Sequence, residues 1–180
     1  MVRLETDRLI LRPPTLDDFD AWATMTADEE TMRFMGGVMP RALTWRAMMT
    51  MIGSWHAVGF AMFSVIEKSS GRWVGRLGPW YPEAWPGTEV GWAIVKDCWG
   101  KGYATEGATA AGDWAFDTLG WTEMIHSIDP GNLASQQVAR KLGSINRGRG
   151  QLPAPFQDSV VDIWGQSREE WHARRTTAGV

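Results

Sequence analysis

The spacing of apolar residues changes near residue 57, and this change restricts the folds that the chain can adopt. Before it, a helical period predicts a helix over residues 42–55. The residues that carry this period are Ala42, Trp45, Met48, Met49 and Ile52. After it, residues 60–67 and 73–80 are typical of two strands joined by the turn KSSGR, and residues 88–95 of a third. A chain with this order packs helices against a sheet.

The remaining segments continue the alternation of helices and strands. Residues 8–12 predict a strand that ends before Pro13, and Thr15 with Asp18 resembles a capping box that opens a helix. The second half predicts a helix (103–119), a strand (122–128), a helix (132–142), a proline-containing loop, a strand (159–164) and a polar tail. We find no repeat, low-complexity tract or linker. The sequence therefore predicts a single domain over residues 1–180 of the α/β class, with a mixed sheet.

The composition argues against several classes of function. The 180 residues carry a formal net charge of −3, which disfavours a generic nucleic-acid-binding protein. No apolar run approaches the length of a membrane span, and the N-terminus lacks the apolar core of a signal peptide. With one cysteine, Cys98, and three histidines without ligand spacing, the sequence predicts no metal site. We therefore expect a cytoplasmic protein that binds neither nucleic acid nor membranes.

The segment CWGKGYATEG, residues 98–107, places three glycines at the start of a predicted helix. The first turn of a helix has N–H groups without internal partners, and the helix dipole adds positive potential there. Gly100 and Gly102 would allow these amides to converge on a phosphate or pyrophosphate. The alternative is a tight strand-to-helix turn without a ligand. Neither GxxxxGK[ST] nor GxGxxG is present, which disfavours nucleotide triphosphatases and Rossmann dehydrogenases.

The segments GWAIVKDCWGKGYATEG and IDPGNLASQQVARKLGS resemble the GNAT superfamily of acetyl-CoA-dependent N-acetyltransferases, and most closely its RimJ/RimL-type branch. The family loop [RQ]-x-x-G-x-[GA] corresponds to Trp99–Ala104, where Gly102 and Ala104 match and Trp99 departs from the usual Arg or Gln. ETDRLILRPPTLDDFDAW (residues 5–22) resembles the first strand and helix of the same branch, and DSVVDIWGQSREEW resembles its last strand and tail. The resemblance implies a mostly antiparallel central sheet with a splayed strand pair, flanked by helices.

The resemblance also implies how acetyl-CoA, the co-substrate, is held. The strand before the loop would pair its free backbone groups with the pantetheine arm, at Ala93, Ile94 and Val95. The pyrophosphate would lie on the amides of the loop and first helical turn. These are the amides of Gly100, Lys101, Gly102, Tyr103, Ala104 and Thr105. The Lys101 side chain adds a charge contact or is simply solvated, and Asn132 either binds the pantetheine arm or only caps its helix.

Catalysis requires a group that accepts a proton from the amine and a group that protonates the CoA thiolate. Glu89, at the start of the strand, is the candidate base if burial raises its pKa, and Glu83 and Asp129 are reserves. The tyrosine that often protonates the thiolate in this superfamily is replaced by Ala139. The resemblance offers Ser135 instead, although a serine in a first helical turn can equally bond to the backbone.

The acceptor is the least constrained part of the prediction. The resemblance implies a primary amine, on a protein N-terminus or a small molecule, next to residues 29–41 and the loop before Glu89. Trp80, Tyr81 and Trp85 would line either the acceptor groove or a homodimer contact. His56 is a candidate proton relay, whereas His126 is expected to be a core histidine. Two alternatives remain: a non-catalytic acyl-CoA sensor on the same fold, and a generic nucleotide-phosphate-binding protein.

Overall fold

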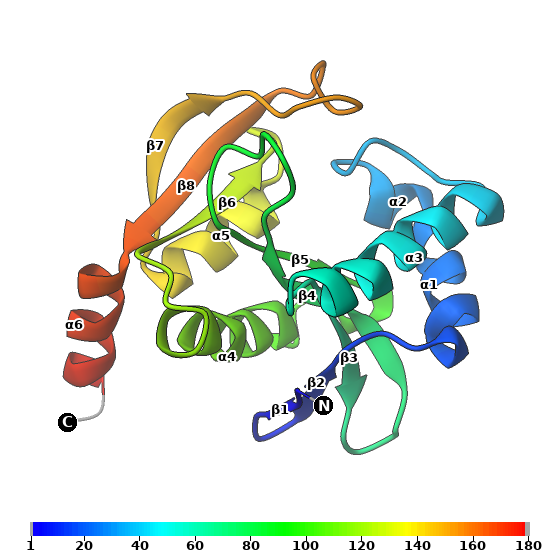
Figure 1. Ribbon diagram of the computed structural model, residues 1–180, viewed down its shortest axis with the longest axis horizontal. Helices are drawn as coiled ribbons and strands as arrows, with labels where there is room; N and C mark the ends of the chain where they lie inside the picture. Colours follow the sequence, from blue (N-terminus) through cyan, green and yellow to red (C-terminus); the bar gives the residue numbers. More distant parts are fainter. Residues whose placement is uncertain (1, 179–180) are drawn as a thin grey trace.

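The computed structural model describes residues 2–178, which form a mixed sheet of eight strands flanked by helices (Figure 1). The strand order is β1-β2-β3-β4-β5-β6-β8-β7. The strands are β1 (Leu4–Glu5), β2 (Leu9–Arg12), β3 (Phe63–Glu67), β4 (Trp73–Trp80), β5 (Glu89–Ile94), β6 (Glu123–Ile128), β7 (Ile145–Gly150) and β8 (Val161–Ser167). All neighbours are antiparallel except β5 and β6, which are parallel. This confirms the predicted fold class.

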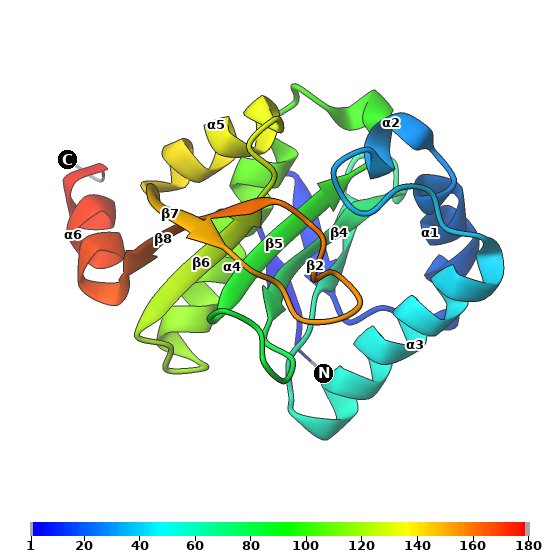
Figure 2. The same ribbon diagram turned by 90° about the horizontal axis from the view of Figure 1, so that it is seen from above.

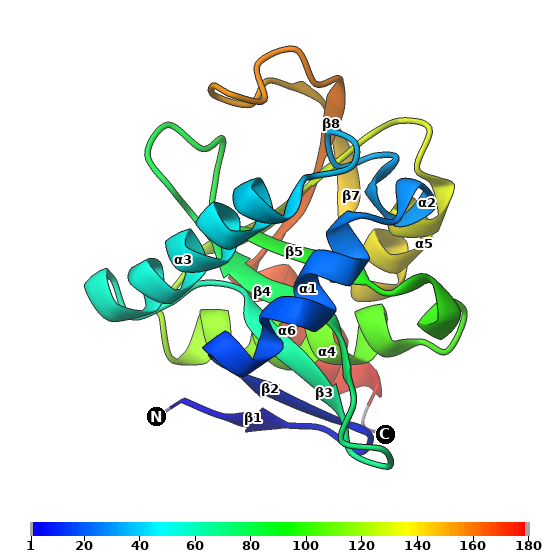
Figure 3. The ribbon, with the colours of Figure 1, turned by 90° about the vertical axis from the view of Figure 1, so that its right-hand side faces the viewer.

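Helices cover both faces of this sheet. They are α1 (Phe19–Thr26), α2 (Glu29–Met32), α3 (Arg41–Ala57), α4 (Tyr103–Asp117), α5 (Leu133–Leu142) and α6 (Arg168–Ala178), with short 3-10 turns at Leu16–Asp18 and Lys96–Cys98. Figure 3 looks onto α1 and α3, which lie in front of β4, whereas α4 lies behind the sheet. None of the described helices is both long and apolar enough to cross a membrane.

Two apolar cores result, one on each face of the sheet. The core under α4 contains Leu77, Val90, Ala108 and Phe116, and the small residues of α4 allow that helix to approach the strands closely. The core under α1 and α3 contains Trp22, Met48, Met62 and Ala93, among others. The faces of β5 thus alternate, so that Glu89, Gly91 and Ala93 share the face of α1 and α3.

The capping box predicted at Thr15 and Asp18 is present, and it fixes the start of α1 relative to the sheet. The buried Asp18 carboxylate accepts from the Thr15 N–H at 2.9 Å, from both terminal nitrogens of Arg12 at 2.7 and 2.8 Å, and from the Ser64 hydroxyl at 2.8 Å. This network satisfies the buried charge. It also ties β2, β3 and the start of α1 together.

Four elements differ from the sequence-based expectation. The segment after residue 144, predicted as a loop, begins with the strand β7, and the polar tail forms the helix α6. The first residues contribute the short strand β1, and the connection after α1 contains the single-turn helix α2. All four are short or polar, so they give no hydrophobic period that would identify them.

Candidate active site at the splayed strands

Strands β5 and β6 meet at one point and then separate. Their parallel ladder is limited to the pair Glu89↔Ile125, with the Ile125 N–H donating to the Thr88 carbonyl at 2.9 Å. On its other side β5 is paired with β4 along its whole length, from Glu89 to Ile94. The residues of β5 after Glu89 therefore present backbone groups that do not join the ladder with β6. An extended amide-containing ligand can pair with such an edge as an added strand.

The register shows which backbone groups face this gap. Thr88 faces β6 through its carbonyl, whereas the Val95 N–H donates to the Val74 carbonyl of β4 at 3.0 Å. Because backbone groups of successive residues point to opposite sides of a strand, Trp92 and Ile94 face the gap, whereas Ala93 and Val95 face β4. The Ile94 carbonyl accepts from the Trp99 indole N–H at 2.7 Å. Of the predicted residues Ala93, Ile94 and Val95, only Ile94 thus directs its backbone into the gap, and Trp92 was missed.

The turn before α4 has the backbone that the predicted anion site requires. Gly100 and Gly102 have φ values of +75° and +84°, in the left-handed region, and Gly102 is the N-cap of α4. Both glycines are exposed. The N–H groups of Tyr103, Ala104 and Thr105, in the first turn, have no partner within the helix. The glycine loop therefore presents free N–H donors and the positive end of the α4 dipole on the surface.

Side chains behind this turn hold it in place. Arg8 donates to the Lys101 carbonyl at 2.9 Å and to the Glu106 carboxylate at 2.7 Å, and its guanidinium lies 4.8 Å from the centre of the Tyr103 ring. The Tyr103 hydroxyl donates to Glu67 at 2.5 Å, so its ring belongs to the scaffold and only its backbone faces the turn. Arg8 also compensates the negative charge of Glu106 next to the anion site. Sequence reasoning missed Arg8, since it lies about ninety residues away from the loop.

The start of α5 lies across the gap from β5. The Asn132 side chain accepts from the Ser135 N–H at 3.1 Å, so the N-cap role of Asn132 is confirmed. The Asn132 amide nitrogen forms no hydrogen bond within residues 2–178, so it is available to a ligand. The Ser135 hydroxyl oxygen accepts from the Trp92 indole N–H at 3.2 Å. Because an indole N–H can only donate, the Ser135 hydroxyl keeps its own proton for another acceptor.

Glu89 lies at the point where the strands separate, and it is buried. Its carboxylate accepts from the Ser127 N–H at 3.1 Å, the Ser127 hydroxyl at 2.9 Å and the Trp85 indole at 2.5 Å. Burial raises the pKa of Glu89, although these bonds and the charge of Arg76 act to lower it. The raised pKa of the Glu89 carboxylate is the property expected of a base. Its hydrogen bonds also tie β5 to β6 and to the loop 81–88, which would equally suit a structural role.

The other titratable candidates lie elsewhere. His126 is buried, with its ring nitrogens 2.7 Å from the Val90 carbonyl and 3.0 Å from the Ser144 hydroxyl, and desolvation lowers its pKa to about 4. The expectation of a core histidine is thereby confirmed. His56 is exposed in the last turn of α3, and Glu83 is exposed in the loop 81–88. Asp129 accepts from the Gly131 N–H at 2.7 Å. Burial raises the pKa of the Cys98 thiol, which disfavours a nucleophilic role.

Three loops converge above Glu89 on the side of α1 and α3. They are residues 33–40, residues 81–88 and residues 151–160, and Figure 2 shows the last two next to each other above β5. The rings of Trp85 and Phe156 are 6.3 Å apart, and Trp85 also contacts Trp80. A methyl group at Gly36 would lie 4.0 Å from the Phe156 ring. Phe156, which sequence reasoning missed, thus lies against Trp85 and next to the predicted acceptor segment 29–41.

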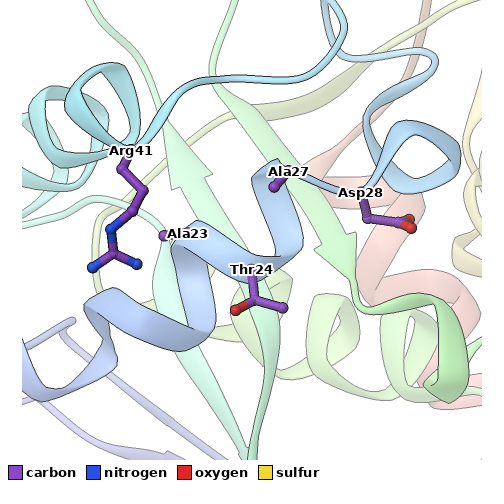
Figure 4. Close-up of a pocket in the computed structure, with 5 residues that line it drawn as sticks. All are labelled: Ala23, Thr24, Ala27, Asp28 and Arg41. Atoms are coloured by element: carbon purple, nitrogen blue, oxygen red, sulfur yellow. The ribbon is translucent and has the colours of Figure 1, made fainter.

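A separate hollow of about 490 Å³ lies on the surface of α1 (Figure 4). It is lined by Ala23, Thr24, Ala27, Asp28 and Arg41. Its three polar side chains already have partners: the Thr24 hydroxyl donates to the Asp20 carbonyl, Asp28 caps α2 by accepting from the Thr31 N–H, and Arg41 pairs with Asp20. This hollow does not touch the strands β5 and β6, so we assign it no part in the chemistry. Among the described residues, no cluster of His, Cys, Asp and Glu could hold a metal ion.

Comparisons with known proteins agree with this geometry. Residues 8–145 match the family described as "Acetyltransferase (GNAT) domain". The chain is 28% identical over 168 residues to the uncharacterized N-acetyltransferase p20 of Bacillus licheniformis, covering 91% of this chain and 94% of that protein. A crystal structure of an acetyltransferase from Agrobacterium tumefaciens superposes with a TM-score of 0.81 at 28% identity, over 93% of this chain and 95% of that one. The ribosomal-protein-S5-alanine acetyltransferase of Vibrio fischeri shares the fold, with a TM-score of 0.72 at 17% identity over 95% and 99% of the two chains.

Proposed function

The chain belongs to the GNAT acetyltransferase family, and we propose that it transfers the acetyl group of acetyl-CoA directly to a primary amine, with both substrates bound together. The observation that carries this proposal is the separation of β5 from β6 beyond the single pair Glu89↔Ile125, with the glycine turn of α4 at its open end. We infer one catalytic domain over the whole chain. A cytoplasmic location and membership of the RimJ/RimL-like branch remain predictions from the sequence.

Acetyl-CoA, the co-substrate of the family, fits the groups that the gap and the turn present. The pantetheine amides would pair with the backbone of Trp92 and Ile94, and the Asn132 amide nitrogen would donate to the arm from the opposite side. The pyrophosphate would lie on the N–H groups of residues 100–105. In this arrangement the side chains of Lys101 and Thr105 contact the phosphates from the edge of the turn. Ala93 and Val95 only support the strand, because their backbone groups face β4.

The reaction then needs little from the side chains. The neutral amine attacks the thioester carbonyl, a C–N bond forms, the C–S bond breaks, and the amine proton passes to the Glu89 carboxylate directly or through a water molecule. A backbone N–H of β5 facing the gap stabilises the negative charge that develops on the carbonyl oxygen. The leaving thiolate takes the proton of the Ser135 hydroxyl while the serine oxygen regains a proton from solvent, and Trp92 orients the hydroxyl by donating to one lone pair of its oxygen.

A screen for release of CoA thiol tests this proposal. The purified protein is incubated with acetyl-CoA and, in turn, N-terminal peptides, aminoglycosides, polyamines and free amino acids. We expect acetyl-CoA-dependent thiol release with at least one of these amine classes, together with an acetylated product detected by mass spectrometry. If the protein binds acetyl-CoA but releases no CoA thiol with any class of amine, the result would favour a non-catalytic acyl-CoA sensor. No feature of the site supports that alternative.

Replacing Ser135 with alanine is expected to lower kcat by about 100-fold, the scale typical of losing a general acid, without changing acetyl-CoA affinity. The Trp92→Phe variant is the matched control, since it removes the indole donor but leaves the hydroxyl, and a smaller loss is expected. Stopped-flow thiol detection and calorimetry measure the two quantities. An unchanged kcat in Ser135→Ala would mean that solvent protonates the thiolate and that Ser135 only caps the helix turn.

A further inference from the structure

Arg76 carries a charge that forms no ion pair among the described residues, although the charge of Glu89 acts on it without contact. It lies on β4 opposite Ala93, on the face that also carries Glu89. Its Nη1 contacts the Met62 sulfur at 2.6 Å, and its Nε is buried without a hydrogen-bond partner. No carboxylate within residues 2–178 forms an ion pair with it, in contrast to Arg12 and Arg72, which pair with Asp18 and Asp97. Burial lowers the pKa of Arg76 to about 10.

A second donor beside Arg76 is also without a partner. The Arg76 guanidinium lies 5.5 Å from the centre of the Trp22 ring, and the Trp22 Nε1 is buried without a hydrogen bond among the described residues. Unpaired buried donors cost free energy, and a charged donor costs more than a neutral one. Both groups can only donate, so the Arg76 guanidinium with its unpaired Nε would be satisfied by a group with several acceptor oxygens.

Met62 occupies the space between Arg76 and Glu89. A methyl group built at Gly91 would lie 2.8 Å from the Met62 terminal carbon and 3.5 Å from a Glu89 oxygen. Gly91 is paired with Gly78 on β4, so both strands lack side chains on this stretch. A thioether is a weak acceptor for a guanidinium, and methionine is flexible enough to move aside. Next to Gly91, the space between Arg76 and Glu89 is therefore filled by an adaptable side chain.

We propose that Arg76 binds a carboxylate of the acceptor, so that the acceptor is a small amine that also carries a carboxylate. This inference rests on the proposed function, because it places the amine end of the same molecule next to Glu89. On binding, the carboxylate takes the place of the Met62 sulfur at Arg76. Arg76 then faces the carboxylate of the zwitterionic acceptor, and Glu89 faces its amine.

The separation of the two charges favours a small acceptor. Arg76 stands opposite Ala93, and Glu89 lies four residues earlier on β5. Four residues of a strand span about 14 Å between backbones. Both side chains extend into this interval, and the charge of each affects the pKa of the other. Two opposite charges that influence each other across this interval match the amine and carboxylate of one small molecule, whereas the C-terminal carboxylate of a peptide lies much further from its amine.

The test compares acceptors with and without a carboxylate, and it compares the wild type with Arg76 variants on the same set of acceptors. CoA release is measured with glycine, L-methionine and L-phenylalanine, with their amides, and with γ-aminobutyrate against butylamine. For the wild-type protein we expect kcat/KM at least about 10-fold higher for the acids, since hydrogen bonds to charged partners are worth more than neutral ones. In Arg76→Met this preference is expected to disappear through KM, while Arg76→Lys retains part of it.

Thermal unfolding separates a binding role from a structural one. Arg76→Met removes a half-buried charge that has no ion-pair partner, so its Tm is expected to be equal to or higher than that of the wild type. Arg12→Met is the matched control, because it leaves the buried Asp18 without its partner and should lower Tm. Equal use of acids and amides by the wild type, a preference that persists in Arg76→Met, or a fall in Tm as large as that of Arg12→Met would each overturn the inference.

Failure of the proposed function would be recognised separately. If no amine releases CoA, the protein is saturated with CoA and titrated with glycine, γ-aminobutyrate and their uncharged counterparts by calorimetry. Binding of the acids that Arg76→Met abolishes would support the carboxylate site in a protein without transferase activity. Absence of such binding would overturn the inference as well.

Discussion

Replacing Gly102 with valine is expected to abolish acetyl-CoA binding while the chain remains folded. Gly102 is the N-cap of α4 with φ +84°, a conformation that a β-branched residue scarcely adopts. A methyl group there would lie 3.4 Å from the Arg8 guanidinium, which holds the turn. We expect the turn to relax to another conformation, so that its N–H groups no longer converge on the pyrophosphate. Calorimetric titration with acetyl-CoA measures the loss.

Gly120 provides a matched control for this substitution. It follows the other end of α4, has φ +71°, and a methyl group there would meet nothing within 4 Å. Forcing a side chain into the left-handed region costs about 1–2 kcal/mol at either position. Gly120→Val should therefore lose similar stability but bind acetyl-CoA normally. A folded Gly102→Val variant with near-normal affinity would remove the turn from the binding site.

The parts of this fold that the sequence predicts are those with a clear hydrophobic period. The strands 73–80 and 88–95 and the helix from Tyr103 are found almost as predicted, because each buries one continuous face. Strand β7 was missed because its side chains are almost all exposed, and α6 because Trp171 is its main buried residue. An edge strand and a peripheral helix need little apolar surface, so their sequences show no period.

The candidate site shows a different limit of prediction from sequence. The glycine turn could be located from the sequence alone, since positive φ values select glycine. Which amides of β5 face the gap depends on the register of β5 against β4 and β6, and a shift of one residue exchanges the two sides. The resemblance therefore located the strand, but the register was needed to find Trp92. The unpaired state of Arg76 is likewise a property of its three-dimensional surroundings, and WVGRLGPW reads as an ordinary strand.

Replacing Glu89 with glutamine is expected to lower kcat by about 100-fold or more, because the amide cannot accept the amine proton. Acetyl-CoA affinity should change little, since the backbone groups that face the gap begin beyond Glu89. Steady-state kinetics with any acceptor found in the CoA-release screen, together with calorimetry, measure both quantities. The variant also loses acceptor capacity toward Trp85 and Ser127, so a separate measurement must distinguish a base from an anchor.

The pH dependence supplies that measurement. Because burial raises the pKa of Glu89, the wild-type rate should increase with pH as the carboxylate ionises above its usual range. The same shift means that the folded state binds the proton more tightly than the unfolded state. Stability from this group is therefore present below the unfolded pKa and is lost as pH rises through the folded pKa. In Glu89→Gln the stability dependence of this group should be absent, and the rate should need a higher pH to recover, because only the ionisation of the amine then remains.

Ser127→Ala separates the two roles of Glu89 most directly. It removes one donor to the carboxylate but leaves the carboxylate and the bond from the Ser127 N–H. If Glu89 is the base, losing a donor to its charged form raises its pKa further, so the rate profile of Ser127→Ala should shift to higher pH with kcat nearly retained at its plateau. If Glu89 only joins β5 to β6, the profile stays in place, and Ser127→Ala and Glu89→Gln lower Tm and acetyl-CoA affinity together. The second pattern would assign proton removal to another carboxylate or to water.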